Sequence, residues 1–379
     1  MAILLINVQI ARRRRKVSVK LSIRLWVLAF FLINTLTFNP FFLEAQLTGE
    51  DLETARLERI NIVDRILDIP RKIFHKQRLE KKAKKKEPKT FADKLDIHYG
   101  VNEGYERNVK LDSSHKGSFF TGQILGASFT DKIRNAFVYR IGYKIRHRNY
   151  YKFADHNILA QTMRAETALR LIPHKLFLET DYYYRIFRRQ HTPLDDFNEN
   201  EVKVGLKNYL IKDTLYQKPS YIFRHYGYRK FKARNSEGEH GLANRKDNVN
   251  AFDHEIGIHI AHNLLIRVHN QIGRHNSNDQ LLDFYDYTYY QIIPVASYHP
   301  AKDWLVTVGY YFQRKNFDER DVYGLGAREN LQSVFGGVYY HFNEYITWKV
   351  NCTYIRSDTN ISELEFQDAS FLTGLEFHF

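Results

Sequence analysis

The sequence predicts an all-β protein, a transmembrane antiparallel up-and-down β-barrel of about fourteen strands. Apolar and polar residues alternate one by one through many segments, which gives each strand two different faces. Most of these segments reach the roughly 9–11 residues that a tilted strand needs to cross a bilayer. Short and long connections also follow one another in turn, as in a barrel whose strands run up and down through a membrane.

The last strand shows the alternation clearly. Phe371, Leu375, Phe377 and Phe379 share one face, and polar or small residues lie between them. This strand resembles the terminal signature of bacterial outer-membrane β-barrels, whose last residue is typically Phe. The resemblance implies that these four residues form a membrane assembly signal for the barrel-assembly machinery. It also implies a multi-pass barrel in the outer membrane of a Gram-negative cell, in contact with outer-membrane lipids.

The same pattern recurs along most of the chain. The predicted strands cover about 93–103, 118–130, 135–149, 157–172, 175–188, 200–211, 220–233, 250–262, 263–274, 282–297, 303–316, 330–342, 345–357 and 368–379. Arg224 and Tyr226 break the alternation in the seventh strand. Pro294 removes a backbone donor in the tenth, which predicts a bulge or an early strand end. Twelve to sixteen strands are therefore compatible with the pattern.

The connections fall into two classes. Short turns at 131–134, 173–174, 300–302 and 343–344 alternate with longer polar loops, which are predicted at 104–117, 189–199, 234–249, 317–329 and 358–367. In outer-membrane barrels the short turns are periplasmic and the long loops extracellular. An even number of strands then places both ends of the barrel in the periplasm.

Two segments precede the predicted barrel domain, 91–379. Residues 1–45 read as a signal peptide, because a basic stretch at 12–16 is followed by the apolar run Leu25–Leu36 and by Ala45 as a cleavage site. An uncleaved anchor helix is the alternative. Residues 46–90 read as a periplasmic segment, with a helix ending at Pro70 and then a basic run at 71–89.

Charge and composition limit the classes of partner and cofactor. The formal net charge is +14, and most of the excess lies in residues 1–90. The basic run at 71–89 is either an arm for an anionic periplasmic partner or a solvated linker. Nucleic acid is excluded as a partner, because the signal peptide removes the protein from it and no aromatic residues interleave with the lysines. No motif predicts a cofactor or a metal site, and Cys352 is the only cysteine.

The inward faces of the strands carry a predicted excess of positive charge. The predicted pore-lining residues are Arg140, Lys144, Arg146, Arg148, Arg164, Glu166, Arg170, Glu179, Asp181, Arg185, Lys203, Lys207, Asp253 and Glu255. With the cations Arg267, Lys315 and Lys349 and the acids Asp286 and Glu376, twelve inward cations face seven inward acids. Such a lumen favours anions if it is open, whereas paired charges would serve structure alone. Inward aromatic residues further predict a narrow channel.

One short motif predicts chemistry. His275, Ser277 and the asparagines at 276 and 278 resemble the catalytic segment of outer-membrane phospholipase A and of lipid A 3-O-deacylases, barrel enzymes whose His and Ser face the lipid. The resemblance implies that His275 acts as the base for Ser277. Asp283 is a possible partner for the imidazole. The alternation of this strand points His275 inward unless Gly273 marks a bulge.

The sequence therefore favours a non-enzymatic, porin-like channel for transport of small, preferentially anionic solutes. Three alternatives stay open: an acyl hydrolase acting on phospholipid or lipid A, an export or assembly barrel with periplasmic partners, and a purely structural barrel.

Overall fold

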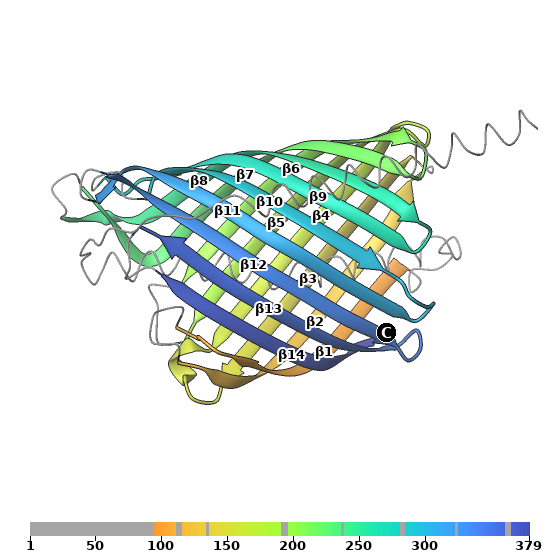
Figure 1. The fold of residues 1–379 in the computed structure, drawn as a ribbon, viewed down its shortest axis with the longest axis horizontal. Coiled ribbons are helices and arrows are strands. Elements are labelled where there is room, and N and C mark those ends of the chain that lie inside the picture. The colour runs from red at the N-terminus through yellow and green to blue at the C-terminus, as the bar shows by residue number, and fades with distance from the viewer. Residues whose placement is uncertain are drawn as a thin grey trace, which may run out of the picture. The chain divides into compact units, whose positions relative to one another are not determined.

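The computed structural model contains a closed barrel of fourteen antiparallel strands, each hydrogen-bonded to its neighbours in sequence, with β1 and β14 closing the sheet (Figure 1). It describes residues 94–110, 116–133, 136–190, 196–235, 239–280, 285–322, 325–360 and 365–379. This confirms the predicted fold class and strand number. Among the described residues, no helix is long and apolar enough to cross a membrane.

The strands match the predicted segments in order. They are β1 (Leu95–Glu106), β2 (Ser118–Ile133), β3 (Phe137–Tyr150), β4 (Ile158–Ile172), β5 (Leu176–Arg189), β6 (Phe197–Ile211), β7 (Leu215–Arg234), β8 (His240–Ala261), β9 (Leu264–Ser277), β10 (Tyr287–Tyr298), β11 (Trp304–Val322), β12 (Leu325–His341), β13 (Ile346–Thr359) and β14 (Phe366–His378). A single 3-10 turn, η1 (Ala154–His156), lies between β3 and β4. The predicted signal peptide, 1–45, and the predicted periplasmic segment, 46–90, lie outside the described residues.

The first and last strands meet at one mouth of the barrel. The backbone N–H of Ile97 donates to the Phe379 carbonyl at 3.3 Å, and the N–H of Phe379 donates to the Ile97 carbonyl at 2.8 Å. Both ends of the barrel therefore lie at the mouth that carries the short turns, which we call the short-turn end. The opposite mouth is the loop end.

Two predicted loops belong largely to strands instead. β7 and β8 leave only residues 235–239 between them, and β11 and β12 leave only 323–324. On β8, Arg245, Asp247 and Val249 are buried on the inner side, while Lys246 between the first two is exposed. The sequence prediction of long loops at 234–249 and 317–329 was wrong because charged residues on the inner face hide the apolar alternation.

The residues that break the sequence pattern in the seventh and tenth strands do not interrupt those strands, although the β7–β8 register shifts beyond Gly227. Arg224 and Tyr226 lie on the inner face of β7 with Ile222, so the alternation is intact and both faces carry large side chains. Pro294 causes neither a bulge nor an early end: β10 continues to Tyr298. Its pairing with β11 stops at Ile292 and resumes at Val295 in the same register, so the missing donor interrupts the ladder only locally.

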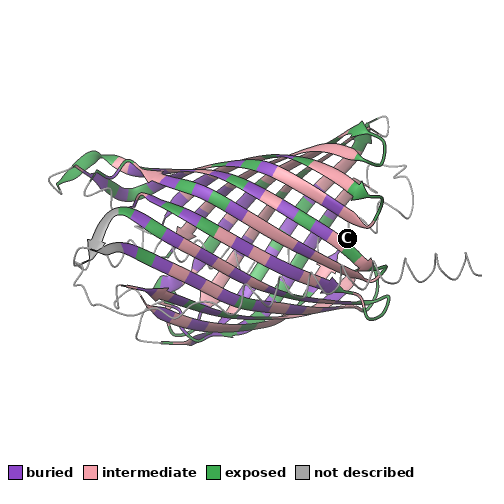
Figure 2. Ribbon diagram, turned by 45° about the horizontal axis from the view of Figure 1, so that its top comes forward, coloured by how far each residue is buried: buried purple, intermediate pink, exposed green. Residues whose placement is uncertain are grey.

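The outer surface of the barrel carries an apolar band with a polar border. Buried and exposed residues alternate along the strands (Figure 2), and the exposed ones nearer the short-turn end include many large apolar side chains. At the border, tyrosine hydroxyls on five strands donate to amide oxygens of neighbouring strands: Tyr143 to Gln161 (2.9 Å), Tyr182 to Asn200 (3.1 Å), Tyr221 to Asn250 (2.6 Å), Tyr290 to Asn270 (3.3 Å) and Tyr310 to Gln332 (3.1 Å). Such a row matches the aromatic girdle of a membrane barrel.

Candidate functional site

The inner wall from β3 to β6 is covered by a network of ion pairs. Arg140 lies 3.3 Å from Glu166, and Arg164 bridges Glu166, at 2.7 Å, and Asp181. The strand register produces this arrangement, since Arg140 pairs with Glu166 on β4 and Glu166 pairs with Asp181 on β5. Arg140 thus faces an acid directly, whereas Arg164 contacts Glu166 along its own strand and Asp181 from a diagonal position, and these two acids face each other.

A second network continues over β5 to β9. Lys203 Nζ lies 2.5 Å from Asp253 Oδ2, and Lys218 contacts both Glu179, at 3.0 Å, and Glu255, at 3.5 Å. Lys218 and Glu255 are direct partners on neighbouring strands, whereas Lys203–Asp253 and Lys218–Glu179 skip a strand. Small side chains between them, such as Gly205 and Ser220, leave the room for it.

Other buried pairs lie elsewhere on the wall. The side chains of Arg185 and Glu199 are 3 % and 0 % exposed and 2.8 Å apart. Lys349 lies 3.1 Å from Glu376, and Arg148 lies 3.1 Å from Glu106. Buried charges at such sites need their partners, because the uncompensated charge is costly in a low dielectric.

Four other predicted pore-lining residues also lie on the inner face. They are Lys144, Arg146, Arg170 and Lys207. Lys144 pairs with Thr162 on β4, and Arg170 lies near the short-turn end of that strand. Lys207 Nζ lies over the rings of Tyr216, at 4.3 Å, and Tyr209, at 5.1 Å. Their role in conduction stays a prediction.

The sequence-based count of inward charge missed many acids. Asp96, Glu106, Glu199, Glu201, Asp247, Glu329 and Asp368 also lie on inner faces, as do the cations Lys218, Arg224 and Arg245. Asp286, counted as inward from the sequence, precedes β10 and accepts a hydrogen bond from the Ser277 backbone N–H. The inner wall is therefore close to electrically balanced. Half of the missed residues lie in strand ends that the sequence prediction had assigned to loops, namely Glu106, Glu199, Arg245, Asp247 and Glu329.

The loop end of the lumen is filled by aromatic and charged side chains. His275 is 3 % exposed, and its ring stacks on Tyr287 with centroids 4.5 Å apart. Nδ1 lies 2.7 Å from the Tyr285 carbonyl oxygen, and Nε2 lies 3.4 Å from Asp247. Asp247 also accepts from Arg245, whose guanidinium lies 3.5 Å from the centre of the Tyr285 ring. We call these five residues the loop-end cluster.

The structure places the hydrolase motif differently from what catalysis requires. The β8–β9 register runs without a shift from Asp247/Ser277 to His259/Leu265, so Gly273 marks no bulge and His275 lies on the inner face. The Ser277 hydroxyl accepts a hydrogen bond from the Asp279 backbone N–H at 3.2 Å. No hydrogen bond joins His275 and Ser277 in the described part of the chain. Asp283 lies outside the described residues.

The terminal residues of the proposed assembly signal line the outer face of β14. Phe371, Leu375 and Phe379 are 46 %, 39 % and 71 % exposed, and Phe377 pairs with Tyr99 across the closing seam. They belong to the apolar band. Their function as a signal stays a prediction.

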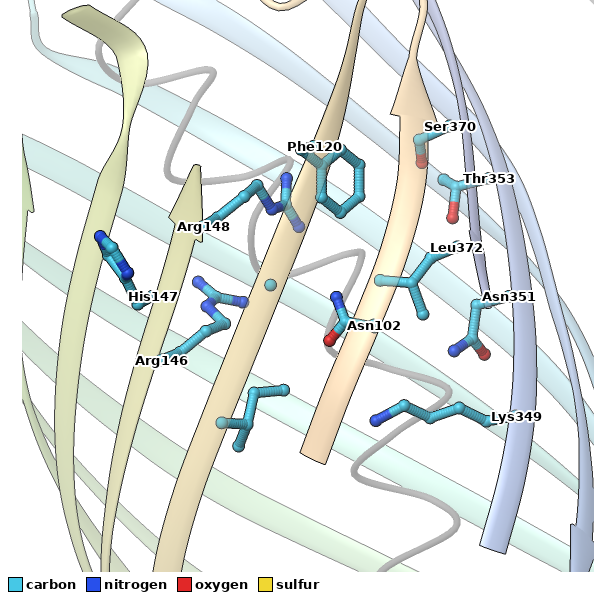
Figure 3. A pocket seen from close by; sticks show the side chains of 12 residues that line it. Asn102, Phe120, Arg146, His147, Arg148, Lys349, Asn351, Thr353, Ser370 and Leu372 are labelled. Carbon is cyan, nitrogen blue, oxygen red and sulfur yellow. The ribbon is translucent and has the colours of Figure 1, made fainter. Parts of the chain in front are cut away.

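A small cavity of about 50 Å³ opens on the inner wall between β3 and β13 (Figure 3). Figure 3 shows Arg146 and Arg148 on one side, Lys349 and Asn351 on the other, and Asn102 between them. The volume suits a small ion or one or two water molecules. Cations, amides and hydroxyls in this lining can all donate hydrogen bonds to an anion. Within the described residues, no group of His, Cys, Asp or Glu could hold a metal ion.

Comparison with known proteins shows similarity of fold alone. No protein-family model matches the chain, and neither does any curated protein. Among solved structures, the barrel is similar to the outer-membrane-expressed OmpT of Vibrio cholerae (12% identity, TM-score 0.44, covering 75% of this chain and 97% of that one). It is also similar to a bacterial polysaccharide outer membrane secretin (8%, 0.42, 75% and 98%) and to the monoaromatic hydrocarbon channel CymD (8%, 0.43, 75% and 87%). These values are too low to transfer any functional detail.

Proposed function

We propose that the protein is an integral barrel of the bacterial outer membrane and forms a narrow channel for small, preferentially anionic solutes. The membrane location is supported by the closed sheet, by the exposed apolar band and by its border of tyrosines. In this orientation the short turns and both ends of the barrel are periplasmic, and the loop end faces outward.

The observation that carries the channel proposal is a row of cations on the inner face of β3. Arg140, Lys144, Arg146 and Arg148 follow one another at two- or four-residue steps. Their neighbour β2 has no charged residue on its inner face between Ser118 and Ser128. The cavity lies over β2 and brings Lys349 close to the end of this row. Although the whole wall is nearly balanced, this row makes the local potential along the β2–β3 wall positive.

The filled loop end supports a narrow passage. The buried cluster there includes Phe187, Phe197, Tyr226, Tyr287 and Phe317. These side chains reduce the open cross-section that a fourteen-stranded barrel would otherwise leave. The catalytic assignment of His275, Ser277 and Asp283 stays a prediction without a supporting contact, so the channel is the function that we favour.

The membrane location gives a first expected result. The purified chain should fold only in detergent or lipid, and folded protein should migrate faster than boiled protein on a denaturing gel, because a closed barrel resists unfolding by detergent. A monomeric chain that stays soluble without detergent would contradict a membrane barrel.

The cation row predicts ion selectivity in planar bilayers. Wild type should conduct in small steps with a preference for anions. Changing Arg140, Lys144 and Arg146 together to glutamate should reduce or reverse this preference, because the local field on permeating ions changes sign. A glutamine variant at the same positions should give an intermediate preference, because it removes the cations without placing a like charge beside Glu166.

A matched control keeps the same charge change outside the lumen. Arg229, Lys230 and Lys246 are exposed on the outside of the barrel, and their replacement by glutamate should leave selectivity as in wild type. A cation-selective wild type, or equal effects of the two triple variants, would argue against the channel proposal.

A further inference from the structure

The β7–β8 hairpin carries four exposed cations beyond the apolar band. Arg229, Lys230, Lys232 and Lys246 form what we call the outer basic patch. None of the four has an acidic partner within the described residues. Lys232 donates to the Leu242 carbonyl at 2.7 Å, which fixes its side chain along the hairpin. Most inward cations, in contrast, are paired with acids.

The height of the patch follows from the strand register. Asn250, which accepts the Tyr221 hydroxyl at the border of the band, pairs with Arg274 on β9. Lys246 lies four residues farther along β8, which is about 14 Å along the strand and about 10 Å in height at a tilt of about 40°. Gly227 pairs with Lys246, so Arg229 lies just beyond it. Lipid headgroups occupy this height in a membrane that covers the apolar band.

The exposed charges at the short-turn end are arranged differently from those of the outer basic patch. Three of the exposed lysines at this end, Lys132, Lys212 and Lys302, lie next to an aspartate in the sequence, whereas Lys175 in the β4–β5 turn does not. On the β7–β8 hairpin, in contrast, four exposed cations lie on one hairpin, and none of them has an acidic partner among the described residues.

We propose that the outer basic patch binds the headgroup of an anionic glycolipid in the outer leaflet, through its phosphate groups. The inference rests on the proposed membrane location. Arg and Lys are the side chains that bind phosphate best, and unpaired cations at an interface attract anionic lipid. Four cations spread along one hairpin fit a headgroup with several anionic groups. Arg274, which is ion-paired to Asp318, marks the edge of the site nearest the apolar band.

The test measures glycolipid binding by the full-length protein in nanodiscs of zwitterionic phospholipid. Titration with bacterial lipopolysaccharide should show saturable binding to wild type. A variant with Arg229, Lys230, Lys232 and Lys246 all changed to glutamine should bind at least about tenfold more weakly. The control variant changes Lys132, Lys175, Lys212 and Lys302 to glutamine, which removes the same charge at the opposite end, and should bind like wild type.

Further arms identify the ligand chemistry. Enzymatically dephosphorylated lipopolysaccharide should bind weakly to every variant, whereas millimolar inorganic phosphate should compete poorly because a single phosphate engages few of the cations. Equal binding by the patch variant and wild type, or equal losses in patch and control variants, overturns the proposal. So does equal binding of phosphatidylglycerol, which shows an unspecific anionic surface. Protein that fails to insert into nanodiscs contradicts the proposed membrane location. Protein that inserts but does not bind the glycolipid contradicts only the proposed lipid site.

Discussion

Replacing Gly374 by alanine is expected to abolish the closed barrel. A Cβ atom at this position would lie 2.3 Å from the Val101 carbonyl oxygen and 2.6 and 2.8 Å from Cβ and Cα of Asn102. All three atoms belong to β1, which pairs with β14 to close the sheet. Backbone atoms cannot rotate away, so β1 would have to separate from β14. Overpacking alone costs about 1–3 kcal/mol, and here it acts on the seam that closes the sheet.

Heat-modifiable gel migration measures this effect after refolding into detergent. Most of the Gly374→Ala protein should migrate as unfolded chain under conditions in which wild type is folded. Gly227→Ala is the matched control, because nothing lies within 4 Å of a Cβ at Gly227. Normal folding of the Gly374 variant would show that the β1–β14 seam tolerates a wider spacing than the structure has.

Replacing Arg245 by methionine should destabilise the loop end locally without unfolding the barrel. Arg245 and Asp247 are both fully buried, 2.6 Å apart at their closest approach. Removal of the cation leaves Asp247 with the His275 imidazole, 3.4 Å away, as its remaining titratable neighbour. Breaking a buried pair costs about 3–5 kcal/mol. Hydrogen exchange at the β8 and β9 amides near the loop end should become much faster, while exchange of amides within the apolar band stays slow.

The exposed Arg229 on the neighbouring strand gives the control for Arg245. Arg229→Met should change exchange by an amount corresponding to less than about 0.5 kcal/mol, because it removes no buried contact. Similar exchange in both variants would mean that the loop-end cluster does not hold the hairpin.

Arg245→Met should also change how the stability of the loop end depends on pH. Asp247 lies beyond the apolar band on β8, where the outer face is polar. Burial alone would raise its pKa, but Arg245 and His275 together hold the pKa below its usual range. The stabilisation by its charged form is thus present above about pH 4 and is lost only as pH falls through the lowered folded pKa. In Arg245→Met burial raises the folded pKa of Asp247 above its usual value, so the buried charge destabilises the loop end at neutral pH. Protonation relieves this penalty, so loop-end protection in the variant should recover as pH falls from about 7 towards about 4.

The strand pattern and the barrel class could be read from the sequence. Side chains of a strand alternate by simple geometry, so residues such as Phe371, Leu375 and Phe379 reveal the lipid-facing side with no knowledge of their neighbours. The number of strands and the position of short turns followed from the same local rule. All fourteen segments are strands in the structure.

Strand ends were less predictable where both faces are polar. The loop-end parts of β8, β11 and β12 carry few apolar residues because they extend beyond the tyrosine border. Periodicity in hydropathy then vanishes although the hydrogen-bonded ladder continues. Acids such as Glu199 and Glu329 were missed for this reason, and the predicted positive lumen became a nearly balanced one.

The sequence by itself determined the barrel, its strand count and the division between inner and outer residues, because these depend on the two-residue repeat of a single strand. Only the tertiary structure decided which charges meet. Pairing of Lys203 with Asp253, or of His275 with Asp247, depends on register, on tilt and on small residues in the strand between, which bring together side chains far apart in sequence. Contacts of that kind follow from closing the sheet, and no local pattern encodes them.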